Sequence, residues 1–248
     1  MKKLLWICGI IGIIHAGWII KFEEKEKNEK PETTNTYISK GIIVFETKEN
    51  VFIFDFKKEI IRIIDHDEKS YAEGTIDEYI SFIEGMHSRM MKKMEEIPPE
   101  QRKMMEEMMK MMQPKINIKK LDRSEKILGY NTEVYEVEVE TGGMYPVKMK
   151  SQNYISPDLK FVPSEISKED AEKISKKFEK IKDKYGFSNI IGKIEEGFTL
   201  KSISYDEKGE EIYRTQAISI NKGEIPPSLI QIPKGYEKEE LKDIFMEE

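Results

Sequence analysis

The chain has 248 residues, 38% hydrophobic and 35% charged, a balance that excludes a protein with many membrane spans. Its 41 basic and 47 acidic residues give a net charge of −6, so no basic excess is present to neutralise phosphates and nucleic acid is excluded as a main partner. The length accommodates one large domain or two small ones, and it is sufficient to bury a real core.

Residues 1–20 predict an export signal or an N-terminal anchor. Two lysines precede an apolar stretch from Leu4 to Ile14, and Ala16 precedes a candidate cleavage site. The alternative is an uncleaved anchor from Leu4 to Ile20, about the minimum length for crossing a bilayer. Either way, we expect the rest of the chain to lie in the periplasm or cell envelope. The single cysteine, Cys8, falls in this segment, so the exported part has no disulfide.

Residues 21–35 predict a charged linker, since they contain one proline and almost nothing apolar. We expect this linker to be disordered or extended, and it would serve as a tether if the N-terminus stays in the membrane. The folded part is then a single domain over residues 36–248.

Residues 36–71 predict an antiparallel meander of strands separated by short polar turns. Phe52, Phe54 and Phe56 alternate on one face, and Val51 and Ile53 lie on the other. Because both faces carry apolar residues, we expect another part of the chain to cover the second face. The aromatic row is interpreted either as sheet core or as the lining of an apolar pocket.

A helix is predicted next, beginning at a capping box in which Thr75 and Glu78 satisfy each other's backbone N–H groups. Apolar residues then recur at helical spacing: Ile76, Tyr79, Ile80, Ile83, Met86, Met90 and Met94. Pro98 and Pro99 end this helix, and a second one restarts at Glu100 and closes before Pro114. Residues 86–112 are therefore a methionine-rich helical insert.

The methionines of this insert allow three interpretations. The first is a soft-metal site for Cu(I) or Ag(I), with Met104, Met108 and Met111 on one helix face. The second is an adaptable surface for an apolar ligand or a partner, since methionine is flexible and polarizable. The third is an ordinary core or surface helix.

After Pro114 the strands return. "KINIKKL" predicts a short strand, and "NTEVYEVEVE" predicts a half-exposed one with Tyr135, Val137 and Val139 on a single face. Gly142-Gly143 predicts the turn to a returning strand. A second amphipathic helix follows from Ser167 to Tyr185, and two more strands flank "DEKGE". We predict an α+β protein with a large curved antiparallel sheet and helices covering its concave face.

Four segments resemble the LolA/LolB-like half-barrel proteins of the bacterial envelope: "GIIVFETKENVFIFDFKKEIIRIIDHDEKSY", "IPPEQRKMMEEMMKMM", "KILGYNTEVYEVEV" followed by "SPDL", and "PPSLIQIPKGY". The order and spacing are most similar to an envelope branch of unknown function with a methionine-rich helical insert. The resemblance implies a half-barrel with an apolar cavity, which in characterised relatives holds the acyl chains of lipoproteins. None of the five arginines matches the functional arginine of those carriers.

Other chemistry finds little support in the sequence. His66 lies between two aspartates in a strand-end turn and is interpreted as a solvated histidine, and neither it nor His87 has a partner at a metal-ligand spacing. No nucleophile elbow or phosphate-binding loop is present. We therefore expect a non-enzymatic protein without a cofactor, which binds an apolar ligand or a lipoprotein-like partner; an envelope interaction scaffold is an alternative. The candidate ligand-binding residues are Phe52, Phe54, Phe56, Ile83, Met86, Met90, Met104, Met105, Met108, Met109, Tyr135 and Val137.

Overall fold

The computed structural model describes residues 17–104, 115–141, 147–161, 164–185 and 197–240. Its strands are β1 (Gly17–Glu26), β2 (Glu32–Ser39), β3 (Ile42–Glu46), β4 (Asn50–Asp55), β5 (Ile60–Asp65), β6 (Ser70–Thr75), β7 (Lys115–Ile127), β8 (Tyr130–Thr141), β9 (Val147–Ser156), β10 (Phe198–Tyr205), β11 (Glu211–Gly223) and β12 (Glu237–Glu239). Its helices are α1 (Ile76–Glu95), α3 (Lys168–Tyr185) and α5 (Pro227–Ile230).

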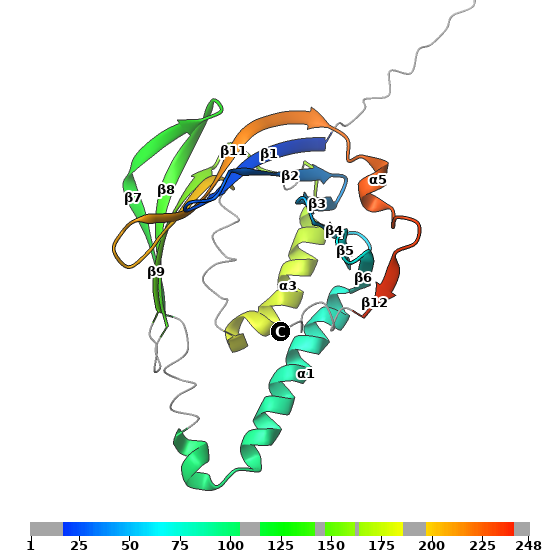
Figure 1. Ribbon diagram of the computed structural model, residues 1–248, viewed down its shortest axis with the longest axis vertical. Coiled ribbons are helices and arrows are strands. Elements are labelled where there is room, and N and C mark those ends of the chain that lie inside the picture. The colour runs from blue at the N-terminus through cyan, green and yellow to red at the C-terminus, as the bar shows by residue number, and fades with distance from the viewer. Residues whose placement is uncertain (1–16, 105–114, 142–146, 162–163, 186–196, 241–248) are drawn as a thin grey trace, which may run out of the picture.

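All of these strands belong to a single 12-stranded sheet with the order β12-β6-β5-β4-β3-β2-β1-β11-β10-β9-β8-β7. Neighbouring strands are antiparallel, except that β12 runs parallel to β6. The sheet arches over α3 and the start of α1 and stays open (Figure 1). This architecture confirms the predicted α+β half-barrel.

The concave face of the β4–β6 region packs against the two long helices. Buried Ile61 of β5 lies in one cluster with Ile76 and Ile80 of α1 and Ile174 of α3. The helices contact the sheet through this cluster because their apolar stripes face it. A second cluster lies on the same face farther along, where Phe161, which precedes α3, packs edge-on against Trp18 with ring centroids 5.7 Å apart.

The convex face is covered by the C-terminal segment, as the two-sided apolar pattern predicted. Val44, Val51 and Ile53 are buried there, and α5 packs against them with Leu229 and Ile230. Figure 1 shows α5 on the outer side of the sheet. The sheet is thus sandwiched at this end between helices inside and the C-terminal segment outside.

The predicted charged linker is wrong. Lys21 to Glu26 are part of β1, which lies in the middle of the sheet between β2 and β11, and residues 32–35 open β2. Ile20 is fully buried, so residues 17–20 also cannot form the end of a membrane anchor in this fold. The charged residues are tolerated because β1 exposes its C-terminal half while its apolar N-terminal half is in the core. Residues 1–16, with the candidate cleavage site, lie outside the described residues.

Two other strand predictions need correction. The stretch "YISKGIIVFET" over residues 37–47, which the predicted meander takes as its first strand, is split into β2 and β3 by a two-residue turn in which Lys40 and Gly41 both have positive φ. β7 is 13 residues long rather than short, and Leu128 and Gly129 make the same kind of turn into β8. Such turns match the right-handed twist of the strands they join, and the Gly at the second position of each turn was a usable signal.

Local helix signals were predicted correctly. Thr75 and Glu78 form the capping box, and Ser167 accepts a hydrogen bond from the Asp170 backbone N–H at the start of α3. α1 ends at Glu95 and helical residues resume at Pro99, so the two prolines break the helix as expected.

Candidate functional site

The β3–β4 hairpin builds an aromatic patch on the concave face. Its register places Phe45 opposite Phe52 and Ile43 opposite Phe54, so all four side chains share one face. The rings of Phe45 and Phe54 meet edge to face with centroids 6.4 Å apart. We call Phe45 and Phe52 the aromatic patch, because these two lie away from the helix-covered cluster.

The aromatic patch is exposed to solvent, whereas the residues in register on either side of it are buried. Reading across the sheet in register, Phe52 follows Ile63, and Phe45 precedes Thr36 and Ile20. Ile63 is 2% exposed and Ile20 0%, whereas Phe45 is 42% exposed and Phe52 is half-buried. An exposed phenylalanine between buried neighbours in a concave sheet face is apolar surface that folding has not used.

The rest of the predicted aromatic row has a structural role. Phe54 and Phe56 pack against the cluster that joins α1 and α3 to the sheet, and Ile83 of α1 packs there too. These three candidate residues are therefore close together but belong to the helix–sheet interface. Of the predicted row, Phe52 alone lies in the aromatic patch.

Tyr135 and Val137 lie in a different part of the sheet. Their strand, β8, is separated from β4 by β9, β10, β11, β1, β2 and β3. Tyr135 is buried and its hydroxyl donates a hydrogen bond to Glu133 at 2.8 Å. The structure therefore does not bring them together with the phenylalanines.

The methionine-rich insert is described only in part. Met104 is 61% exposed, while Met94 is buried at the end of α1, where its carbonyl oxygen accepts a hydrogen bond from Arg102 at 3.1 Å. In Figure 1 the lower end of α1 lies well away from the sheet. The remaining candidates are outside the described residues or have undescribed side chains: Met86, Met90, Met105, Met108, Met109 and Met111. The Cu(I) or Ag(I) site over Met104, Met108 and Met111 thus stays a prediction.

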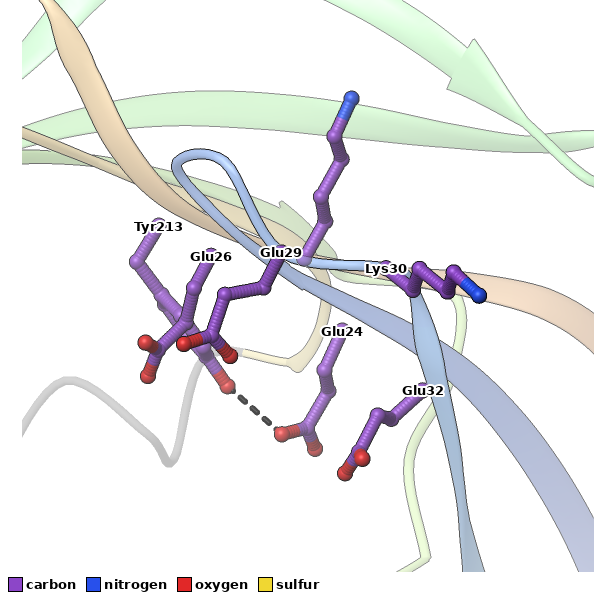
Figure 2. Close-up of a pocket in the computed structure, with 7 residues that line it drawn as sticks. Glu24, Glu26, Glu29, Lys30, Glu32 and Tyr213 are labelled. Atoms are coloured by element: carbon purple, nitrogen blue, oxygen red, sulfur yellow. Dashed lines mark hydrogen bonds between the residues drawn. The ribbon is translucent and has the colours of Figure 1, made fainter.

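The same concave face becomes acidic toward one end of β1 and β2. Glu24, Glu26, Glu29 and Glu32 line a shallow pocket together with Lys25, Lys30 and Tyr213. Figure 2 shows the four carboxylates extending to one side, while Lys30 extends to another. We call these four glutamates the acidic strip.

Tyr213 anchors the acidic strip to β11. Its hydroxyl donates a hydrogen bond to Glu24 at 2.8 Å, and Thr34 donates another to the same carboxylate at 2.8 Å. Burial and the neighbouring carboxylate hold the pKa of Tyr213 well above its ordinary value. These two hydrogen bonds fix the position of the Glu24 side chain, whereas Glu26, Glu29 and Glu32 have no ion-pair partner among the described residues.

Sequence reasoning missed Phe45 and the acidic strip. Phe45 was detectable, because a three-residue polar turn after Glu46 places it opposite Phe52 in a hairpin. The strip also had a signal: Trp18, Ile20, Phe22, Glu24 and Glu26 alternate along one face of β1, a pattern hidden by its position at an apolar N-terminus.

Metal binding through common ligands finds no support in the part of the chain that the structure describes, where no group of three His, Cys, Asp or Glu residues could hold an ion. His66 is not a solvated turn residue as interpreted. It is half-buried, and its Nδ1 lies 2.8 Å from the hydroxyl of Tyr236. Among the described helices, none is long and apolar enough to cross a membrane.

No protein-family model matches the chain, and no curated protein matches it. Among solved structures, an uncharacterized conserved protein from Thermus thermophilus superposes with a TM-score of 0.45 at 8% identity, over 92% of this chain and 91% of that one. PNGF-II matches with a TM-score of 0.41 at 10% identity, over 91% of this chain and 31% of its own.

MucB matches with a TM-score of 0.38 at 10% identity, over 89% of this chain and 58% of its own. The chain therefore spans less than two thirds of PNGF-II and MucB. Scores and identities this low give no support to any particular function, so the proposals below depend on the geometry of the chain itself.

Proposed function

We propose that the protein is an exported, non-enzymatic binding protein of the LolA/LolB-like half-barrel type, which holds an apolar group on its concave face. The ligand class is a lipid, an acyl chain or a hydrophobic protein segment. The observation that carries the proposal is the aromatic patch, in which Phe45 is 42% exposed between buried neighbours.

Energetics support an apolar ligand at this place. Removing a phenylalanine side chain fully from water is worth about 1.5–3 kcal/mol, and Phe45 keeps a large part of that surface available. The patch is also rigid, because β3 and β4 are flanked by β2 and β5 and are covered on the convex face by α5. A preformed surface loses little conformational entropy when a ligand binds, so more of the contact energy contributes to affinity.

Export and location follow from the N-terminal pattern of two lysines and an apolar stretch before Ala16. We place the folded chain in the periplasm or cell envelope, either free after cleavage or close to the membrane. β1 begins at Gly17, directly after the candidate cleavage site, so cleavage there would leave the whole sheet in the exported part.

Displacement of a fluorescent fatty acid from the purified protein tests the proposal, together with native mass spectrometry of protein isolated from its host. The informative variant is Phe45→Ser, because this side chain is exposed and its loss leaves the core intact. The matched control is Leu128→Ser, which removes a 44% exposed side chain in the β7–β8 turn at the far end of the sheet.

We expect the wild type and Leu128→Ser to bind the probe equally, and Phe45→Ser to bind it about tenfold more weakly, which corresponds to roughly 1.4 kcal/mol. Equal binding of the probe by all three proteins would show that the probe binds somewhere other than the aromatic patch. Absence of any co-purifying lipid, bound probe or bound apolar peptide would end the proposal.

A further inference from the structure

We infer that the concave face binds a polypeptide segment that carries lysine or arginine beside apolar residues. This inference rests on the proposed function and selects among its ligand classes. It begins from the aromatic patch on β3 and β4 and adds the acidic strip, which lies on the same face of the sheet at the neighbouring strands β1 and β2.

The strand registers give the distance between the aromatic patch and the acidic strip. Thr36 of β2 is opposite Phe45 on one side and Ile20 on the other, and Glu32 is opposite Glu24. Since Thr36 and Glu32 are four residues apart on one strand, the patch and the strip are separated by roughly 13 Å along β2. An extended peptide of about four residues spans that distance.

The strip's charge decides which ligand fits. Four glutamates face this side, and the lysines that line the same pocket are Lys25 and Lys30. In the register of β1 with β11, Lys25 pairs with Arg214 and so lies on the opposite face from Glu24 and Glu26, and Figure 2 shows Lys30 directed away from the carboxylates. The strip therefore presents uncompensated negative charge next to apolar surface.

A fatty acid or phospholipid bound on the patch would place a carboxylate or phosphate within reach of that charge. The strip lies little more than one Debye length from the patch at about 0.1 M salt, where the screening distance is roughly 10 Å, so repulsion persists at low ionic strength. A basic segment is attracted by the acidic strip, whereas an anionic lipid is repelled by it. Charge complementarity of this kind raises specificity and association rate more than raw affinity.

The test uses two fluorescein-labelled short peptides on the full chain, one alternating lysine and leucine and one alternating glutamate and leucine. We expect the lysine–leucine peptide to bind, with an affinity that falls as salt is added, and the glutamate–leucine peptide to bind at least tenfold more weakly. Phe45→Ser should weaken binding of the lysine–leucine peptide, because the leucines of the peptide then lose their contact with Phe45 in the aromatic patch.

The charge variant is the double change Glu26→Gln and Glu32→Gln, which removes two exposed carboxylates that have no ion pair among the described residues. The control is Glu68→Gln with Glu207→Gln, which changes the net charge equally at two exposed turn positions. We expect about fivefold weaker peptide binding in the first double variant, because exposed ion pairs with the peptide are each weak, and no change in the control.

Equal weakening in both double variants would show attraction by net charge alone and overturn the inference. Displacement of the fluorescent fatty acid without any binding of the lysine–leucine peptide would also overturn it, while leaving the proposed apolar site standing. Tighter binding of the glutamate–leucine peptide, or of phosphatidylglycerol vesicles, would likewise assign the face to an anionic ligand.

Discussion

Arg62 donates a hydrogen bond through its Nη1 atom to the backbone carbonyl oxygen of Ile230 at 2.6 Å, and so ties the C-terminal segment to the convex face of the sheet. The same guanidinium pairs with the carboxylate of Glu73 on the neighbouring strand. Farther along, the hydroxyl of Tyr236 reaches His66, and β12 adds a parallel strand to the edge of β6. The C-terminal segment thus covers the convex face and adds one strand to the β6 edge of the sheet.

Arg62→Ala should weaken the attachment of the C-terminal segment to the convex face of the sheet. The substitution leaves the Glu73 carboxylate and the Ile230 carbonyl oxygen without their partner, so we expect the free energy of unfolding to fall by about 1–3 kcal/mol. Amide exchange over residues 224–239 should accelerate more than exchange in β4. Lys58→Ala is the control, because Lys58 is 72% exposed and its ion pair with Asp55 is worth little. Identical stability of the two variants would contradict the tie.

The position of β1 makes a sharper prediction. A chain that begins at Gly17 should unfold cooperatively, and a chain that begins at Lys27 should not, because β2 and β11 would lose the strand that joins them. Ile20→Ala alone should cost about 2–5 kcal/mol, since this side chain is fully buried. Thermal melts followed by circular dichroism measure both effects. A cooperative melt of the chain from Lys27 would show that β1 is dispensable.

Signals confined to neighbouring residues were read correctly from the sequence. The cap at Thr75, the helix break at Pro98 and the alternation of Tyr135 with Glu136 each depend on contacts within a few residues, and the structure has all three. The curved sheet with helices on one face also followed, because two-sided apolar strands require covering layers.

Features that depend on distant partners were not predictable in this way. β1 pairs with β11 across nearly 200 residues, and the local alternation from Trp18 to Glu26 identifies neither this partner nor the central position of β1 in the sheet. The exposure of Phe45 depends on where α1 and α3 contact the sheet, which periodicity does not fix. The acidic strip needed the β1–β2 register before its glutamates could be placed on one face.

Thr75→Ala should destabilise the protein by about 1 kcal/mol, because the Thr75 hydroxyl accepts a hydrogen bond from the Glu78 backbone N–H and is lost in the variant. The Glu78 carboxylate in turn accepts a hydrogen bond from the Thr75 backbone N–H, which completes the capping box. Urea unfolding measures the change, and the slope with urea should stay the same. Ser81→Ala, at an exposed position within α1, serves as the control and should be neutral or slightly stabilising. A neutral Thr75→Ala would mean that the capping box contributes nothing to folding.

Glu59 should make the free energy of unfolding depend on pH in the acid range. Its carboxylate, in the turn before β5, pairs with both Lys173 and Lys177 of α3, and Lys177 also reaches Asp77 at 2.5 Å. Hydrogen bonds from Lys173 and then Lys177 hold the pKa of Glu59 below its ordinary value. A carboxylate with a lowered pKa in the folded state stabilises fully above its unfolded value of about 4.3, and this contribution is lost as the pH falls through the folded value.

The wild type should therefore lose stability below about pH 4.3 more steeply than Glu59→Gln, which cannot titrate there. At neutral pH Glu59→Gln should be the less stable protein, because the cationic ends of Lys173 and Lys177 lose their shared partner, and the difference should shrink as the pH falls. Urea unfolding across the acid range measures this, with Glu207→Gln as an exposed control that should follow the wild type. A difference between the wild type and Glu59→Gln that stays constant with pH would show that Glu59 keeps an ordinary pKa, and the α3 lysines would then not hold it as an ion.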